Sequence, residues 1–185
     1  MNKKIILAAL LLVALAFGAY FVFNKNGMES LVPKNPSTSF DGKNTSFIID
    51  GKEVTLRNGV SEVEAVPGSA SKITTTYFGN ELSGDLTGDG IPDTAFYVTQ
   101  NTGGSGLFYY VVVAMKTESG YKNTNAFRIG DRIAPQPMYI PGGTTELNVN
   151  FAERREGEPM TTPPSQGAVT LLKVTKEGVL EGLMK

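Results

Sequence analysis

The acidic segment Asp85–Asp93 (Asp-Leu-Thr-Gly-Asp-Gly-Ile-Pro-Asp) lies between two segments of strand-like composition. Lys72–Phe78 precedes it and Thr94–Gln100 follows it, and both are rich in β-branched and aromatic residues. Residues of these types favour pleated strands. A loop that joins strand to strand predicts β-structure around this point and argues against helices flanking it.

The spacing of oxygen-bearing residues in this loop suits a calcium ion. Ca²⁺ takes roughly six to eight oxygen ligands, and an acidic loop that sends side chains inward at alternate positions supplies them. Gly90 stands at the sixth position, where such loops turn sharply and a Cβ would clash. The predicted ligands are the side chains of Asp85, Thr87, Asp89 and Asp93 and the carbonyl of Ile91.

The loop departs from the EF-hand pattern, because Phe96 occupies position twelve in place of a bidentate Glu. With Asp93 closing it and a strand following it, the loop resembles those of integrin-like (FG-GAP) repeats. A bound ion would be structural rather than catalytic. The alternative is an acidic surface turn, since Asp and Gly are common turn residues; three aspartates so close together would repel one another without a cation.

The N-terminus carries Lys3 and Lys4 and then an uncharged segment, Ile5–Phe23. As a helix this segment spans roughly 28 Å, about the thickness of a bilayer core. Residues 1–23 are therefore predicted to be a transmembrane anchor, with a cleaved signal peptide as the alternative. The leading lysines place the N-terminus in the cytoplasm and the rest of the chain outside the membrane. Cleavage would instead release a secreted protein.

Residues 24–44 are predicted to be a flexible linker, because they mix Asn, Lys, Gly, Ser and Pro with few apolar residues. Residues 45–185 then suffice for one extracytoplasmic domain. Strand-like segments follow one another through this domain, and none shows a sustained helical period. We expect a mostly β fold, a single antiparallel β-rich domain built as a sandwich or a curled sheet.

Within this domain, Asp50-Gly51 predicts a hairpin turn between two short strands. Leu107–Met115 is apolar on both faces and is expected to be the central strand, paired with Thr94–Gln100. The other expected strands are Glu62–Val66, Asn125–Ile129, Met138–Ile140, Glu146–Phe151 and Ala168–Thr175.

The chain contains no His, no Cys and no Trp. These absences exclude Ser-His-Asp triads, cysteine nucleophiles, His-ligated zinc and disulfides. Acidic residues number 18 and basic residues 17, so no excess of positive charge favours nucleic acid as a partner. No catalytic residue and no organic cofactor site is predicted.

Three further polar segments each allow two interpretations. Asn101–Gly106 is rich in glycine but lacks the Gly-Lys-Ser/Thr ending of a P-loop, so a hairpin connection is expected. Arg132 either braces a carboxylate of the acidic loop or its neighbours, or belongs to a solvated turn. The charged, proline-containing segment Glu153–Pro164 is either a partner-binding surface or a solvated loop.

The chain also resembles a group of uncharacterised exported or membrane-anchored bacterial proteins. They share a Gly-Asp-Leu-x-Gly-Asp-Gly-x-x-Asp loop, then Gly-Gly-Ser-Gly-x-Phe-Tyr-Tyr, Gly-Asp-Arg and Gly-Glu-Pro-Met segments. In this chain the segments are Gly84–Asp93, Gly103–Tyr110, Gly130–Arg132 and Gly157–Pro164. The resemblance implies a shared domain over about Val66–Val174, and it implies no activity.

The sequence therefore predicts a non-catalytic binding or interaction module, anchored in the cytoplasmic membrane and facing the cell envelope. Its partner would be an envelope protein or polymer. The rival hypothesis is an envelope hydrolase that uses carboxylates alone, such as a glycosidase. An enzyme of that kind needs a pocket with two carboxyl groups whose pKa values are altered, away from any bound ion.

Overall fold

The computed structural model describes residues 39–183. This part of the chain is mostly β and contains no helix, so no helix in it is able to span a membrane. The predicted anchor, 1–23, and most of the predicted linker lie outside the described residues. The strands are β1 Ser46–Ile49, β2 Lys52–Thr55, β3 Val60–Glu64, β4 Lys72–Gly84, β5 Asp93–Asn101, β6 Phe108–Thr117, β7 Gly120–Asn123, β8 Phe127–Asp131, β9 Ala134–Pro135, β10 Leu147–Glu153, β11 Gln166–Val174 and β12 Leu180–Gly182.

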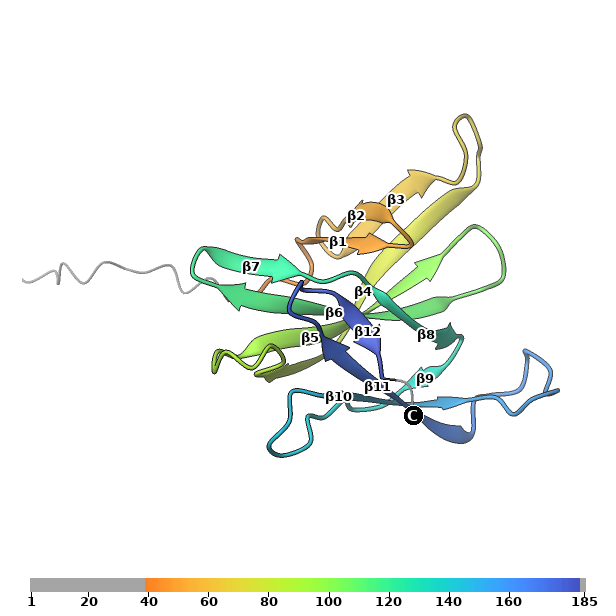
Figure 1. Cartoon of the computed structure of the whole chain (residues 1–185). Helices are drawn as coiled ribbons and strands as arrows, with labels where there is room; N and C mark the ends of the chain where they lie inside the picture. The colour runs from red at the N-terminus through yellow and green to blue at the C-terminus, as the bar shows by residue number, and fades with distance from the viewer. Residues whose placement is uncertain (1–38, 184–185) are drawn as a thin grey trace, which may run out of the picture. The chain divides into compact units, whose positions relative to one another are not determined.

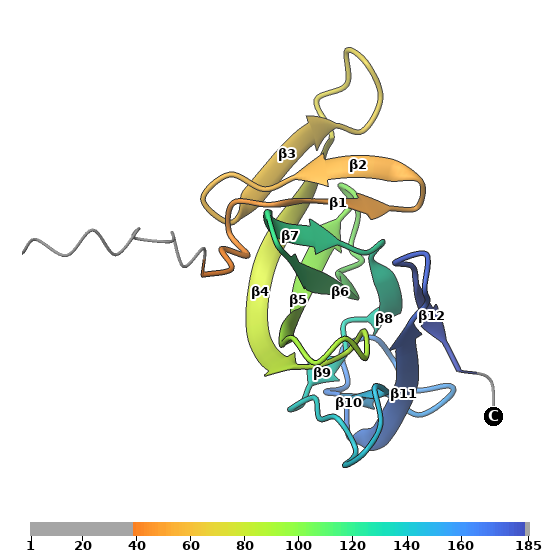
Figure 2. The ribbon, with the colours of Figure 1, turned by 60° about the vertical axis from the view of Figure 1, so that its left-hand side comes forward.

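A six-stranded antiparallel sheet forms the centre of the described domain. Its strand order is β3-β4-β5-β6-β7, and β8 pairs with the part of β6 that β7 leaves uncovered. The longest strand, β4, curves strongly (Figure 2). Its register with β5 shifts on either side of Gly79, and both Gly79 and Asn80 have positive φ. Bulges of this kind bend a strand, so they explain why the sheet curls.

Two smaller sheets cover opposite faces of the central one (Figure 1). On one face lies the β1–β2 hairpin, whose Phe47 and Ile49 pack against Phe96, Val98 and other buried residues of β5 and β6. The four-stranded sheet β12-β11-β10-β9 covers the other face and brings its apolar side chains to a second core, with Leu147, Val149, Phe151 and Leu172.

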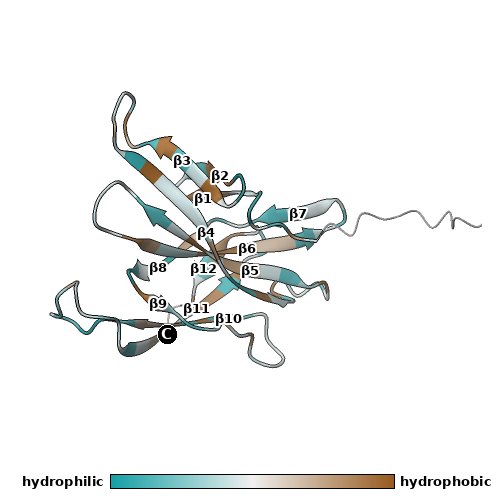
Figure 3. Cartoon of the chain, turned by 180° about the vertical axis from the view of Figure 1, so that it is seen from behind, coloured by the Kyte–Doolittle hydropathy of each residue, from teal (hydrophilic) through white to brown (hydrophobic). Residues whose placement is uncertain are grey.

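Strands β5 and β6 are consequently buried on both faces. Residues Tyr97 and Val111 are paired in register and face the four-stranded sheet, whereas Phe96 and Val112, the neighbouring pair, face the hairpin. A strand buried on both sides needs a continuous apolar sequence. Brown shades run along β6 in Figure 3, and the predicted central position of this segment is confirmed.

The expected pairing of Thr94–Gln100 with Leu107–Met115 is confirmed, as is the hairpin at Asp50-Gly51, where both residues have positive φ. One expected strand is wrong. Met138–Ile140 forms only an isolated bridge, between Tyr139 and Asn148. Pro137 and Pro141 flank this segment and lack the N–H that a longer ladder requires.

Residues 39–44, which the sequence placed in the linker, pack against the domain. The Phe40 ring lies 5.0 Å from that of Phe96 and 5.3 Å from that of Tyr121, measured between centroids. Tyr77 lies so close to Gly42 that a Cβ there would collide with its ring. The structured part of the chain therefore begins before Asn44.

We expect Phe40→Ala to lower the free energy of unfolding by about 1–2 kcal/mol, because the ring is partly buried against the core. Val66→Ala is the matched control, since Val66 is 61% exposed. Thermal unfolding of the full chain in neutral detergent, followed by circular dichroism, measures both. Equal stability of Phe40→Ala and the parent chain would contradict this contribution of Phe40.

Candidate functional site

The acidic loop connects the end of β4 to the start of β5, and Asp93 is its buried anchor. The Asp93 side chain is fully buried. One carboxylate oxygen, Oδ2, accepts hydrogen bonds from the N–H groups of Leu86 (3.0 Å) and Thr87 (3.1 Å), and Oδ1 accepts one from the N–H of Lys116 (2.9 Å). Asp93 therefore lies beneath the loop and ties its first residues to the end of β6.

Asp85 organises the outer half of the loop. Its carboxylate accepts hydrogen bonds from the N–H groups of Gly88 (2.6 Å) and Gly90 (2.9 Å). The bond from Gly90, with that from Gly88, holds the pKa of Asp85 below its ordinary value. Both glycines have φ near +80°, a conformation in which any side chain would be strained.

Asp89 and Thr87 are exposed at the loop surface. One oxygen of Asp89 accepts a hydrogen bond from the N–H of Ile91 (2.8 Å). Leu86 holds the loop from inside, because its side chain is buried in the core beneath the four-stranded sheet. Within residues 39–183, acidic side chains form no group of three or more placed to hold a metal. The structure thus separates Asp93 from the more exposed Asp85 and Asp89.

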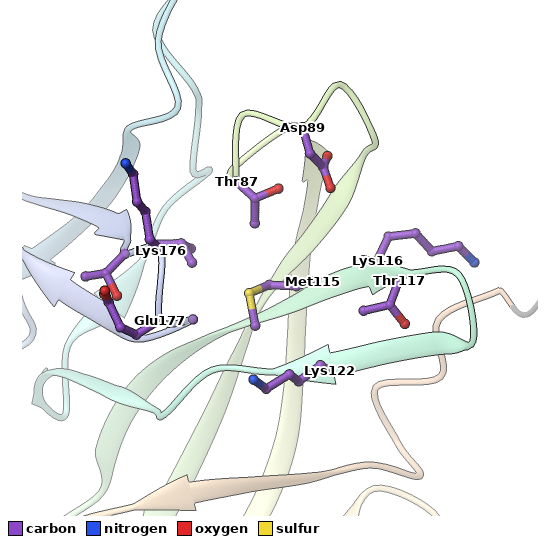
Figure 4. Close-up of a pocket in the computed structure, with 11 residues that line it drawn as sticks. Thr87, Asp89, Met115, Lys116, Thr117, Lys122, Lys176 and Glu177 are labelled. Atoms are coloured by element: carbon purple, nitrogen blue, oxygen red, sulfur yellow. The ribbon is translucent and has the colours of Figure 1, made fainter.

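A cleft of about 390 Å³ opens beside this loop, and we call it the loop cleft. Three segments that are distant in sequence form its walls: the acidic loop, the β6–β7 hairpin and the turn between β11 and β12 (Figure 4). Met115 lies between these walls. The charged lining residues are Asp89, Lys116, Lys122, Lys176 and Glu177.

Sequence reasoning did not find the three lysines or Glu177, because nothing in the sequence links segments so far apart. The hydroxyl group of Thr175 donates a hydrogen bond to the Glu177 carboxylate, and this bond lowers the pKa of Glu177. The Thr175 hydroxyl oxygen also accepts a hydrogen bond from the N–H of Val179 (3.3 Å). The β11–β12 turn is therefore fixed by its own side chains.

The Gly103–Tyr110, Gly130–Arg132 and Gly157–Pro164 segments meet at the opposite end of β5. Asp131 accepts a hydrogen bond from the N–H of Leu107 (2.8 Å), and the carbonyl oxygen of Leu107 accepts one from the N–H of Arg132 (2.8 Å). Arg154, at the start of the long connection from β10 to β11, donates to the carbonyl oxygens of Arg132 and Thr162. The Gly-Gly-Ser-Gly, Gly-Asp-Arg and Gly-Glu-Pro-Met segments are thus joined by structural hydrogen bonds.

Arg132 pairs with its neighbour Asp131, at 3.0 Å, rather than with a carboxylate of the acidic loop. Burial acts to raise the pKa of Asp131, but hydrogen bonds from Arg132 and the Leu107 N–H outweigh it and lower the pKa. Arg132 also has a φ of +49°, in the left-handed region.

Comparison with protein-family models, curated proteins and solved structures found no match for this chain. Its function must therefore be inferred from the site itself.

We expect Asp93→Asn to destabilise the domain by about 1–3 kcal/mol even without calcium, because an amide NH₂ would face buried N–H donors that now have carboxylate acceptors. Asp89→Asn is the control, since its exposed side chain keeps an oxygen for the Ile91 N–H. Denaturant unfolding of the full chain in detergent with EDTA measures both. Similar losses of unfolding free energy in the two variants would show that Asp93 stabilises the domain no more than the exposed Asp89 does.

Proposed function

We propose that this chain is a membrane-anchored extracytoplasmic binding module in which the acidic loop holds a structural Ca²⁺ ion. In this proposal residues 1–23 form a single transmembrane helix and the β domain faces the cell envelope. The observation that carries the calcium site is the loop backbone. Asp85 and Asp93 hold it in a tight turn, with the carboxylate of Asp89 and the hydroxyl of Thr87 at its surface.

The proposed ligands are Asp85, Thr87, Asp89 and the Ile91 carbonyl, joined by Asp93. To bind the ion, Asp93 would have to give up a backbone hydrogen bond, because both its oxygens accept such bonds, and the same holds for Asp85. Even the full set leaves room for water or a ligand oxygen, since Ca²⁺ takes roughly six to eight oxygens. The domain would then contact an envelope protein or polymer through its loops.

The pKa values of the carboxyl groups support a non-catalytic role. A glycosidase acid must stay protonated near neutral pH, which requires a raised pKa. The carboxyl groups of Asp41, Asp85, Asp131 and Glu177 each have a lowered pKa, because hydrogen bonds favour the charged form, so none of these four suits the role of a glycosidase acid. We therefore place the carboxylate hydrolase second.

We expect millimolar CaCl₂ to raise the melting temperature of the full chain in neutral detergent relative to EDTA. A ligand that binds only the folded state stabilises it by about 2.7 kcal/mol at a hundredfold excess over Kd. Asp89→Ala should remove the increment because it removes an exposed anionic ligand and leaves no oxygen in its place. Asp50→Asn, a substitution in the distant β1–β2 turn, should keep it. A calcium increment that is absent from the parent, or unchanged in Asp89→Ala, would rule out this site.

The proposed location can be tested with single cysteines, because the chain has none of its own. Glu118→Cys, exposed in the β6–β7 turn, should react with a membrane-impermeant maleimide in spheroplasts that express the chain. Asn2→Cys should react only after the membrane is permeabilised. Protection of the cysteine at position 118 in intact spheroplasts would overturn the extracytoplasmic location.

A further inference from the structure

A second pocket lies between the β1–β2 hairpin and the central sheet, and we call it the hairpin pocket. Its volume is about 180 Å³. Residues 49–54 of the hairpin line one side, and residues of β3, β4 and β5 line the other (Figure 2). Gln100 of β5 lies on the same face of the sheet as Phe96 and Val98, which the hairpin covers. The hairpin pocket shares no lining residue with the loop cleft.

Three polar side chains form a row across the sheet side of the hairpin pocket. Ser61 of β3 pairs in register with Thr75 of β4, which pairs in register with Gln100 of β5. Thr75 is 2% exposed and Gln100 is 8% exposed. The amide nitrogen of Gln100 donates a hydrogen bond to the Thr75 hydroxyl oxygen (3.1 Å). Thr75 and Gln100 are thus a buried, hydrogen-bonded pair that lines the pocket.

Within residues 39–183, each member of this buried pair keeps one hydrogen-bonding group without a partner. The side-chain oxygen of Gln100 accepts no hydrogen bond, and it is open to the pocket rather than sealed in the core. Thr75 accepts the bond from Gln100, so its own O–H remains to donate. The two groups are neighbours, because the amide that carries the oxygen is bonded to Thr75. A ligand atom that both donates and accepts can satisfy both groups at once.

Apolar side chains adjoin this polar pair on both sides of the hairpin pocket. Val63 of β3 pairs in register with Ile73 of β4, two residues along from the polar row, so an apolar row lies beside the polar one. From the hairpin, Ile49 and Val54 line the pocket. Water between apolar walls makes few hydrogen bonds, so a ligand group that displaces it from there should be apolar.

The charged lining residues are exposed and so lie at the mouth of the hairpin pocket: Asp50, Lys52 and Glu53. Beside Gln100 and Thr75, an ionised ligand group would lose its water and gain no counter-charge, which is costly. A trans amide also fits poorly, because its N–H and C=O point in opposite directions, whereas the two unpartnered groups are neighbours. A hydroxyl group fits, since its single oxygen both donates and accepts.

We propose that the hairpin pocket binds a neutral deoxy sugar, a sugar unit that carries a methyl group in place of a hydroxymethyl group. One sugar hydroxyl would donate to the Gln100 oxygen and accept from the Thr75 hydroxyl, and the methyl group would lie against the apolar walls. At about 180 Å³, the pocket is smaller than sites for drug-sized ligands, which measure about 300–1,000 Å³. It therefore takes one sugar unit of a larger polymer.

A threonine side chain of a protein partner also carries a hydroxyl and a methyl group, but the hairpin pocket favours the sugar. So small a side chain would leave much of the 180 Å³ unfilled and lose contacts with the walls. The polar groups at the mouth can bind the other hydroxyls of a sugar ring. The pocket does not depend on calcium, whereas the identification of its ligand as part of an envelope polymer rests on the proposed function.

The test is saturation-transfer NMR of the full chain in EDTA, in a detergent without a sugar headgroup. The probes are methyl L-fucoside and methyl L-rhamnoside. Methyl L-galactoside and methyl L-mannoside are the matched ligands, because they differ from the probes only by a hydroxyl at C6. We expect a deoxy sugar to bind about fivefold or more tighter than its matched ligand, since an unpaired hydroxyl is disfavoured between apolar walls. Its C6 methyl protons should receive the strongest saturation.

Two variants test the position of the site. Gln100→Leu removes the amide and should weaken binding about fivefold or more. Ser61→Phe should block the pocket with a ring, and it breaks no side-chain hydrogen bond within the described residues, so it serves even if Gln100→Leu does not fold. Val60→Phe is the matched control and should bind as the parent does, because it places the same ring on the other face of β3.

The sugar site would be overturned by a lack of saturation transfer to both deoxy sugars, by equal affinity for them and their matched ligands, or by full binding in Ser61→Phe. Tighter binding of N-acetylthreonine methylamide would overturn it in favour of a peptide partner. If the deoxy sugar binds in EDTA and calcium does not stabilise the chain, only the calcium proposal fails. If calcium stabilises the chain and neither deoxy sugar binds, only this inference fails.

Discussion

The buried carboxylate of Asp93 is the group on whose hydrogen bonds the acidic-loop end of the domain depends. A buried charge is tolerated only when hydrogen bonds replace the water that it loses, and three backbone N–H groups supply them. Two of these groups belong to the acidic loop and one belongs to Lys116, at the end of β6. The loop and the adjoining wall of the loop cleft are thus held together by one side chain.

Because β5 and β6 are buried on both faces, the position of the acidic-loop end of the domain is restricted. Each strand needs an apolar cover on both faces, and the β1–β2 hairpin and the four-stranded sheet provide one each. The ends of the central strands are the places where loops can emerge. The acidic loop lies at one end of β5, and the segments around Gly103, Asp131 and Arg154 meet at the other.

The two ends differ in what their polar groups are available to do. Around Asp131 and Arg154, the charged groups bind backbone carbonyl and N–H groups and each other, which fixes the chain. Around the loop cleft, by contrast, Lys122 and Lys176 make no salt bridge within the described part of the chain. We therefore place the proposed binding function of the loops at the acidic-loop end and infer that the cluster around Asp131 and Arg154 is structural.

The sequence by itself determined the β class, the β1–β2 hairpin, the pairing of β5 with β6 and the position of the acidic loop, because each follows from local composition or from turn residues adjacent in sequence. It missed the short strands β7, β9 and β12, which carry too few residues for a periodic signal. Only the tertiary structure separated Asp93 from the surface aspartates, since a carboxylate looks the same in sequence whether it meets solvent or buried N–H groups. It alone placed Lys122 and Lys176 in the lining of one cleft with that loop, because Lys176 reaches the cleft only through the packing of the four-stranded sheet on the central one.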